Sequence, residues 1–161
     1  MLKKIYNKVT HEWDTSVEEA LKSFIRLPAL SPDFDKKWEE NGVLLKALED
    51  AQAWAEKQGI KGLRCEIIKD DGFTPCLFVE VDATSDKKFE RSVFFYGHLD
   101  KQPPNEGWDP DKSAWEPVIQ NGRLYGRGAV DDGYAFYTSL AAVKALQTLG
   151  IPHPRCVGSV S

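Results

Sequence analysis

The chain has 161 residues, of which 42% are hydrophobic and 29% are charged, a length and composition typical of a single globular domain. Lys and Arg together number 21 and Asp and Glu 25, so the net charge is −4 and does not favour nucleic acid or an anionic membrane as a partner. No segment approaches the roughly 18 consecutive apolar residues of a transmembrane helix, and the first residues lack the apolar stretch of a secretory signal.

Two helices are predicted in the first part of the chain. Thr15 and Ser16 are each followed three residues later by a glutamate, the capping-box pattern that marks a helix start. The helix that begins there ends before Pro28 and has one apolar face, formed by Val17, Ala20, Leu21, Phe24 and Ile25. A second helix is predicted from about residue 35 to residue 58, with a left-handed cap at Gly59 and a buried face of Leu44, Leu45, Leu48, Ala51 and Ala55.

Three strands are predicted next, over residues 64–69, 76–81 and 93–96, because the apolar residues change from helical to strand spacing. A polar turn over residues 84–88 precedes the third strand, and connections this short favour a hairpin or meander. The third strand is a continuous apolar run, so we expect it to be buried.

An irregular segment follows over residues 101–117, which is rich in proline and contains Trp108 and Trp115. A loop of this length in a compact domain is usually functional or disordered. The two tryptophans argue against disorder, which is associated with few aromatic residues.

The last part of the chain predicts a hairpin, a helix and an incomplete strand. Asn121-Gly122 between apolar residues is a hairpin turn signal, and a helix is predicted from about residue 133 to residue 149. Residues 155–161 begin like a strand, but Gly158 and Ser159 stand where a central strand needs apolar side chains. We therefore expect no central strand there.

Neither the cysteines nor two isolated histidines suggest a site. Cys65, Cys76 and Cys156 are scattered and include no Cys-x-x-Cys pair, which favours buried free thiols over a disulfide framework or a zinc knuckle. Free thiols indicate a reducing compartment, so we expect a cytoplasmic protein. His153, between two prolines, is expected to lie in solvent, and His11 is expected to have no special role.

The predicted strand over residues 93–96 leads directly into His98 and Asp100. Residues i and i+2 of an extended chain point to the same side, so these two side chains can share one site. An imidazole that binds a metal usually donates its second N–H to a carboxylate, a pairing that these residues could form. The same spacing also occurs in ordinary polar turns, so the residues alone leave both interpretations open.

Asp131 and Asp132 lie just before the helix predicted from residue 133. Carboxylates are common at helix starts because they cap the free N–H groups, so by themselves these residues favour capping. However, ligands of open α/β sheets bind beyond the carboxyl ends of strands, where loops of neighbouring strands meet. A histidine with carboxylates at such a place suits Zn²⁺, Mn²⁺ or Co²⁺ better than Ca²⁺.

Three motifs, in order along the chain, resemble the N-terminal motifs of the M20-family metallopeptidases, which are two-metal amidohydrolases. They are Gly97-His98-Leu99-Asp100-x-Gln102-Pro103, Gly107-Trp108-Asp109 and Gly122-Arg123-Leu124-Tyr125-Gly126-Arg127-Gly128-x-x-Asp131-Asp132-Gly133. Leu99 and the Asp131-Asp132 pair are most similar to the carnosinase-type dipeptidase branch, since the deacetylase branch usually has Thr and Met at those places.

The resemblance implies the fold and the extent of the domain. The implied fold is α/β, a mixed β-sheet flanked by helices of the zinc-exopeptidase (phosphorylase/hydrolase-like) type, in truncated form. Residues 1–161 would be the N-terminal portion of the catalytic domain, with the remaining catalytic half and the lid or dimerisation domain absent. Full-length relatives are often homodimers, so a second copy is an expected partner of the complete protein.

The resemblance also implies a role for each matching residue. His98 corresponds to a ligand of one metal, Asp131 to the carboxylate that bridges both metals, and Asp100 to a catalytic residue that orients His98. The bond between Asp131 and Asp132 is expected to be cis. The implied cofactor is Zn²⁺, two ions per complete site, with Mn²⁺ or Co²⁺ possible, and the implied reaction is hydrolysis of dipeptides or N-acyl amino acids by a metal-activated water. No substrate-binding residue is identified.

Other parts of the family pattern are missing. The family supplies a Glu-Glu pair, one general base and one metal ligand, and further on an acidic residue and a His as ligands. After Val157 we expect the sequence to leave the family pattern, so these 161 residues alone should have negligible turnover. The alternative is a catalytically inactive truncated product that acts as a binding module or is an unstable fragment. A third interpretation is a metal-free carbohydrate or peptide binder that uses Trp108 and Trp115.

Overall fold

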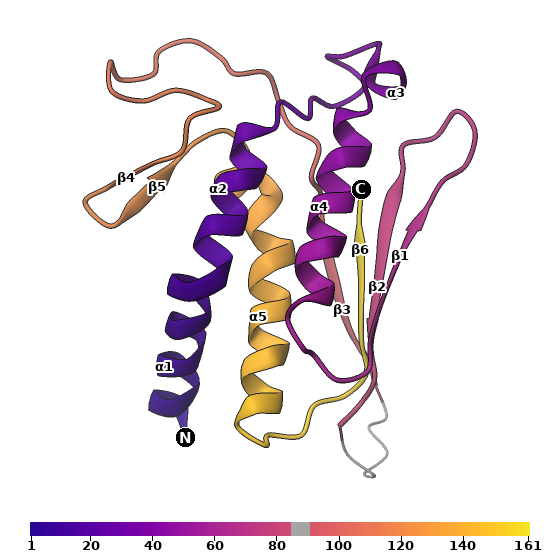
Figure 1. Cartoon of the computed structure of the whole chain (residues 1–161), viewed down its shortest axis with the longest axis vertical. Coiled ribbons are helices and arrows are strands. Elements are labelled where there is room, and N and C mark those ends of the chain that lie inside the picture. Colours follow the sequence, from indigo (N-terminus) through magenta and orange to yellow (C-terminus); the bar gives the residue numbers. More distant parts are fainter. Residues whose placement is uncertain (85–90) are drawn as a thin grey trace.

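The computed structural model describes residues 1–84 and 91–161, and its centre is a four-stranded mixed sheet (Figure 1). The strands are β1 (Leu63–Ile68), β2 (Cys76–Val81), β3 (Val93–Gly97) and β6 (Cys156–Val160). Their order is β1-β2-β6-β3, in which β6 is antiparallel to β2 and parallel to β3. The predicted α/β class, with a mixed sheet flanked by helices, is confirmed.

All helices lie on one side of this sheet, where α4 and α5 pack on its face and the others pack against these two or against each other (Figure 1). They are α1 (Leu2–Glu12), α2 (Glu18–Arg26), α3 (Trp38–Asn41), α4 (Val43–Glu56) and α5 (Tyr134–Thr148). α4 contacts β1 and β2, and α5 contacts β3. The core between the layers includes Leu21, Ile25, Leu48, Leu77, Val81, Leu140 and Val143. None of the helices in the described ranges has the length and apolar character needed to cross a membrane.

The first helix begins earlier than the capping-box pattern predicts. α1 starts at Leu2 and continues through one wider turn, η1 (Trp13–Val17), into α2. The hydroxyl of Thr15 donates to the carbonyl of His11 at 2.7 Å instead of capping a helix start. The predicted start is therefore wrong, because a threonine inside a helix can bond back to the carbonyl four residues earlier.

The predicted helix over residues 35–58 is interrupted at Gly42, so that prediction is also wrong. Gly42 has φ +67°, a left-handed conformation that separates α3 from α4. The side chain of Asn41 accepts a hydrogen bond from the backbone N–H of Val43 at 2.9 Å. Leu45 is only half-buried, whereas Gly59 has φ +66°, the left-handed cap that the sequence predicts.

β3 lies at the edge of the sheet, although its apolar sequence predicts burial. The side chains of Phe94 and Tyr96 are 63% and 67% exposed. β6 occupies the central position between β2 and β3, so the expectation of no central strand there is wrong. Backbone hydrogen bonds do not depend on side-chain polarity, and the alternating residues Cys156 and Val160 supply the side chains that face the core.

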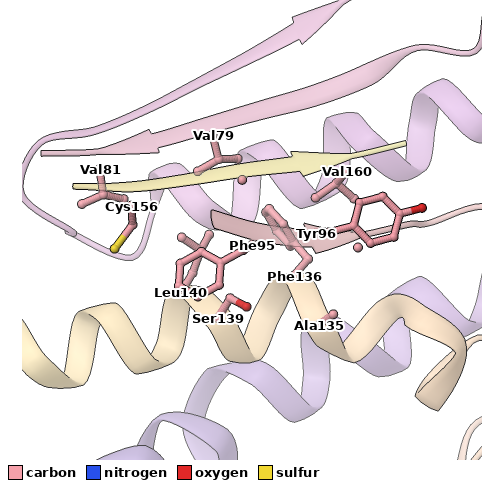
Figure 2. Close-up of a pocket in the computed structure, with 12 residues that line it drawn as sticks. Val79, Val81, Phe95, Tyr96, Ala135, Phe136, Ser139, Leu140, Cys156 and Val160 are labelled. Carbon is pink, nitrogen blue, oxygen red and sulfur yellow. The ribbon is translucent and has the colours of Figure 1, made fainter. Parts of the chain in front are cut away.

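An apolar cavity of about 20 Å³ lies between β6, β3 and α5 (Figure 2). Phe95 lines it from the sheet, and Phe136 and Leu140 line it from α5. Gly158 is part of the sheet wall and contributes no side chain. The absence of a side chain at Gly158 thus leaves a small gap between β6 and α5.

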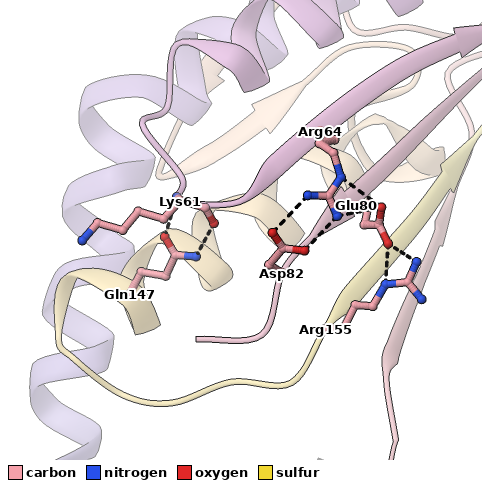
Figure 3. Close-up of polar contacts among 6 residues, drawn as sticks. All are labelled: Lys61, Arg64, Glu80, Asp82, Gln147 and Arg155. Atoms are coloured by element: carbon pink, nitrogen blue, oxygen red, sulfur yellow. Dashed lines mark hydrogen bonds and ion pairs between the residues drawn. The ribbon is translucent and has the colours of Figure 1, made fainter. Parts of the chain in front are cut away.

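The uncovered face of the sheet carries a cluster of charges on β1, on the end of β2 and on the residues next to β2 and β6 (Figure 3). Arg64 donates to Glu80 and Asp82, with an Arg64 Nη2 to Asp82 Oδ1 distance of 2.8 Å, and Arg155 pairs with Glu80. These side chains lie at the surface, where ion pairs add little stability but keep the face hydrophilic. Apolar side chains also lie on this face, among them Phe94 and Tyr96 on β3 and Ile68 on β1, which are 63%, 67% and 49% exposed.

His153 is buried, so the expectation that it lies in solvent is wrong. It is 2% exposed, and both ring nitrogens have partners. Nδ1 lies 2.8 Å from the carbonyl oxygen of Pro154, and Nε2 lies 3.1 Å from Nε2 of Gln147. Gln147 also bonds both backbone groups of Lys61 (Figure 3). These bonds attach the end of α5 to the segment before β1.

The second half of the chain is otherwise as the sequence predicts. The segment 101–117 contains no helix or strand apart from an isolated bridge between Lys101 and Leu30. Asn121-Gly122 connects a separate hairpin of β4 (Val118–Gln120) and β5 (Arg123–Tyr125). The predicted turn over residues 84–88 falls almost entirely outside the described residues.

Candidate active site

His98 and Asp100 follow directly after β3 and point to the same side. Nδ1 of His98 lies 3.0 Å from Oδ1 of Asp100 and 3.1 Å from its carbonyl oxygen. Leu99, between them, is 1% exposed and packs in the core. The alternation of an extended chain therefore separates a buried anchor from two polar groups, as the spacing predicts.

Asp131 faces the other nitrogen of His98. Its Oδ1 lies 3.2 Å from Nε2 of His98. Asp131 belongs to an irregular turn, η2 (Ala129–Gly133), in which its φ of −116° and ψ of 88° are not helical. The bond from Asp131 to Asp132 is cis, as the resemblance implies. The structure thus brings together the three residues that the sequence nominates as a site.

The two ring nitrogens of His98 each face a carboxylate, Nδ1 that of Asp100 and Nε2 that of Asp131. A proton on Nδ1 satisfies the contacts with Asp100, and in the neutral imidazole the lone pair of Nε2 then faces the carboxylate of Asp131. Burial lowers the pKa of His98, but the hydrogen bond to the Asp100 backbone and the charges of Asp100, Asp131 and Asp132 raise it more, so its pKa is raised overall. The arrangement attracts a positive charge between Nε2 and Asp131.

The buried side chain of Lys101, one residue after Asp100, fixes this segment to the end of α2. This role was not predicted from the sequence. The side chain is 1% exposed, and Nζ donates to the carbonyls of Phe24 at 2.6 Å, Ile25 at 3.2 Å and Leu27 at 2.6 Å. These carbonyls lie at the C-terminal end of α2, where helix carbonyls lack intrahelical partners. Burial lowers the pKa of Lys101 to about 7. A lysine in a proline-rich loop gives no sequence signal for such a position.

Two glycines let the turn of Asp131 approach this buried lysine. A Cβ atom on Gly128 would lie 2.8 Å from Cε of Lys101, and one on Gly133 would lie 2.3 Å from Cε1 of Phe24. Both distances are shorter than side chains tolerate, so any other residue would push the turn away. Lys101 and Phe24 therefore connect the segment of His98, the end of α2 and the turn of Asp131.

The described part of the chain does not hold a complete metal site. Within residues 1–84 and 91–161, no group of three or more His, Cys, Asp or Glu side chains is arranged to hold a metal ion. His98 and Asp131 offer one nitrogen and one carboxylate at most.

Comparison with a family model supports the resemblance that the motifs indicate. Residues 94–160 match the model of Peptidase family M20/M25/M40. This match includes all three motifs and reaches residue 160, so the expectation that the sequence leaves the family pattern after Val157 is wrong.

Related proteins of two kinds match parts of this chain. Succinyl-diaminopimelate desuccinylase from Aromatoleum aromaticum is 41% identical over 70 residues, which are 42% of this chain and 17% of that protein. Cys-Gly metallodipeptidase dug1 from Schizosaccharomyces pombe is 36% identical over 67 residues, 40% of this chain and 14% of that protein. A desuccinylase from Nitratiruptor matches 80% of this chain with 29% identity, and the match covers 29% of that protein's length. The chain therefore spans less than a third of these relatives.

Solved structures show the same fold. The di-peptidase Dug1p from Saccharomyces cerevisiae aligns with all of this chain and 34% of its own, with a TM-score of 0.75 and 19% identity. Human carnosine dipeptidase 1 aligns with 99% of this chain and 34% of its own, with a TM-score of 0.75 and 21% identity. The predicted resemblance to the M20 metallopeptidases is confirmed by the family model in sequence and by these neighbours in fold.

Proposed function

We propose, from the relationship of this chain to the M20 metallopeptidases, that it forms the N-terminal portion of the catalytic domain of a metal-dependent hydrolase of dipeptides or related amides. The relationship supports a peptidase-type hydrolase. The two-metal mechanism, the substrate and the roles of single residues are parts of the proposal. A cytoplasmic location and a homodimeric complete protein stay predictions.

One contact carries the proposal, the 3.2 Å approach of Nε2 of His98 to Oδ1 of Asp131. A neutral imidazole with its proton on Nδ1 would present a lone pair to this carboxylate, and the two repel unless a cation lies between them. A second proton on Nε2 supplies that charge when no metal is bound, in line with the raised pKa of His98, and a metal ion would take its place. Two donor atoms on a tetrahedral zinc ion, with bonds of about 2.0 Å, are about 3.3 Å apart. Nitrogen and oxygen donors at this separation fit Zn²⁺, and also Mn²⁺ or Co²⁺.

The residues of the chain would have distinct roles in such a site. Asp100 holds the proton on Nδ1 of His98 and so aims Nε2 at the metal. Asp131, whose side chain is 64% exposed, has a free oxygen for a second ion and would be the bridging ligand. When bound, the metal pair would activate a water and polarise the scissile carbonyl. The general base and the other ligands would have to come from outside the described residues.

Zinc binding tests the roles of His98 and Asp131 directly. Titration calorimetry of the 161-residue chain should detect one weak zinc site, because two protein ligands hold a metal poorly. His98→Ala and Asp131→Asn should each remove this binding, whereas His11→Ala, an exposed histidine in α1, should leave it unchanged. Unaltered zinc affinity in His98→Ala would refute the assignment.

Hydrolysis tests the requirement for the rest of the site. We expect the zinc-loaded 161-residue chain to cleave a dipeptide such as Cys-Gly no faster than buffer does. The protein isolated from its own cells should have an intact mass above 18.1 kDa and should cleave the dipeptide. A native mass of 18.1 kDa without activity would instead support the alternative, a non-catalytic product.

A further inference from the structure

We propose that Lys101 is a positioning residue for the candidate metal site: it supports both the segment of His98 and the turn of Asp131, and it thereby sets the distance between the two metal-binding atoms. The identification of these atoms as metal ligands rests on the proposed function. The positioning of the two side chains against each other by Lys101 does not.

The backbone of Lys101 is fixed to the loop that follows α2. Its N–H donates to the carbonyl oxygen of Ala29 at 2.8 Å, and its carbonyl oxygen accepts from the N–H of Ser31 at 2.9 Å. Asp100, whose carboxylate contacts His98, is the preceding residue. The segment that carries His98 is therefore attached to this loop through the backbone of Lys101.

The side chain of Lys101 reaches the end of α2. Nζ donates to three carbonyl oxygens there, those of Phe24, Ile25 and Leu27. It also lies 3.9 Å from the ring centre of Phe24 and 5.3 Å from that of Trp115, and an aromatic face stabilises an ammonium group. Each of the three N–H groups of the ammonium can thus have an acceptor, so the side chain is held in one place.

The turn that carries Asp131 packs directly against Lys101 and Phe24. The N–H of Gly133 donates to the carbonyl oxygen of Gly128 at 2.9 Å, which closes the turn. A Cβ atom on Gly128 would lie 2.8 Å from Cε and 3.1 Å from Cδ of Lys101, and one on Gly133 would collide with the ring of Phe24. Both ends of the closed turn are therefore in close contact with this support, and a shift of the support displaces Asp131.

Both donor atoms of the candidate site thus depend on one residue. Nε2 of His98 belongs to the segment that the backbone of Lys101 fixes, and Oδ1 of Asp131 belongs to the turn that packs on its side chain. Without the ammonium group the side chain loses its attachment to α2, so the distance of 3.2 Å between the two atoms is no longer fixed. A metal ion needs both donors at bonding distance at the same time, so a less fixed distance lowers its affinity.

The first test measures the contact between His98 and Asp131 without metal. Nitrogen NMR in the presence of EDTA records the Nε2 signal of His98, assigned with His98→Ala, and the shift that Asp131→Asn causes in it. With Lys101→Met this shift should be at least about twofold smaller than in the wild-type chain, because the two side chains no longer keep one separation. Methionine retains a side chain of similar length and removes the N–H donors.

Val143→Ala is the control for a general loss of stability. Val143 is 2% exposed and lies on α5, about three helical turns beyond Asp131. Urea unfolding compares the stability of this variant with that of Lys101→Met, and Val143→Ala should leave the shift caused by Asp131→Asn unchanged. An undiminished shift in Lys101→Met, or an equal decrease in Val143→Ala, would overturn the proposal.

If Lys101→Met does not fold, Gly128→Ala provides the test. It retains the ammonium group and its three acceptors and separates only the turn from the lysine side chain, so the effect of Asp131→Asn should again decrease. Gly122→Ala should not change this effect, because Gly122 has a similar φ of +73° but an added Cβ there meets no atom of the described residues within 4 Å. The same effect of Asp131→Asn in Gly128→Ala as in the wild-type chain would contradict the proposal.

Zinc affinity is the second property to measure. Titration calorimetry should show about tenfold weaker binding in Lys101→Met than in the wild-type chain, and unchanged binding in Val143→Ala. Zinc binding that does not require His98 would refute the proposed function, and the metal-free comparison would still decide whether Lys101 positions Asp131. Zinc binding that requires His98 but is equally strong in Lys101→Met would overturn the positioning role and leave the proposed function intact.

Discussion

The neighbouring strands β3 and β6 occupy positions opposite to those that their sequences predict: β3 lies at the edge of the sheet and β6 lies inside it. β3 is a run of large apolar residues, yet Phe94 and Tyr96 are 63% and 67% exposed at the sheet edge. β6 contains Gly158 and Ser159, yet it pairs on both sides, and its Val160 is 4% exposed. The position of a strand therefore depends on its partners and on which residues face the core, not on its overall hydrophobicity.

The segment after β3 anchors this exposed strand. Leu99 is buried in the core, its N–H donates to the carbonyl of Ser161 at 2.7 Å, and Lys101 is buried against α2. His98 and Asp100 therefore follow an exposed edge strand, but the residues beside them, Leu99 and Lys101, are buried. The candidate site is thus held in place by Leu99 and Lys101 in the loop after β3. Substitutions in β3, in β6 and at Lys101 measure how much each of these parts contributes to the free energy of unfolding.

The largest effect is expected from a charge in the centre of the sheet. Val160→Asp buries a carboxylate without a partner and should lower the free energy of unfolding by about 4 kcal/mol. Tyr96→Asp, on the exposed edge strand, should lower it by less than about 1 kcal/mol. Urea unfolding followed by circular dichroism measures both. Equal losses would show that β3 is as buried as β6.

A smaller loss is expected when the anchor of β3 is removed. Lys101→Met leaves three carbonyls without their donor and should lower the free energy of unfolding by about 2 kcal/mol. Lys36→Met, on the exposed surface, is the matched control. A Lys101→Met variant as stable as the wild type would contradict the anchoring role.

The same residue predicts a pH dependence. The pKa of Lys101 is lowered from 10.5 to about 7 by burial, so between these values the unfolded chain binds a proton that the folded chain does not. The free energy of unfolding should therefore rise as pH increases from about 7 toward 10.5. Lys101→Met should lose this increase, and a profile that is the same in both proteins would refute the assignment.

Replacing the exposed aromatic residues of β3 with serine should change the self-association of the protein more than its free energy of unfolding. Phe94→Ser with Tyr96→Ser should alter the free energy of unfolding by less than about 1 kcal/mol, because both side chains are already largely in water. Sedimentation velocity should show less self-association, since an exposed apolar edge strand favours pairing with another chain. Unchanged association would show that other surfaces hold the copies together.

The smallest effect is expected at Gly158. An added Cβ would lie 3.7 Å from Cβ of Val79 and 3.9 Å from Phe95, which are ordinary contacts, beside the cavity of Figure 2. Gly158→Ala should raise the free energy of unfolding by about 0.5 kcal/mol, because alanine restricts the unfolded chain and adds a contact. A decrease would mean that β6 needs glycine for its conformation.

Local patterns predicted the elements better than their arrangement. β2 has the predicted bounds, and the Asn121-Gly122 hairpin and α5 lie where the sequence places them. The order of strands was not predictable from local spacing, because β6 reaches its place through pairing with segments that are distant in sequence. The missed interruption at Gly42 shows that one glycine inside a helical pattern does not indicate whether the helix breaks.

The candidate site was predictable in part. The spacing of His98 and Asp100 predicts that they share a side, whereas the approach of Asp131 was expected from the family resemblance. The buried position of Lys101 could not be predicted, because it depends on free carbonyls of a helix that lies far away in the sequence.

The close packing of Gly128 and Gly133 has a consequence for large-scale mutagenesis. In a scan of all single substitutions, both positions should tolerate replacement as poorly as His98, because any side chain would collide with Lys101 or Phe24 and displace the turn of Asp131. Fitness values alone would then rank these glycines among the chemical groups of the site.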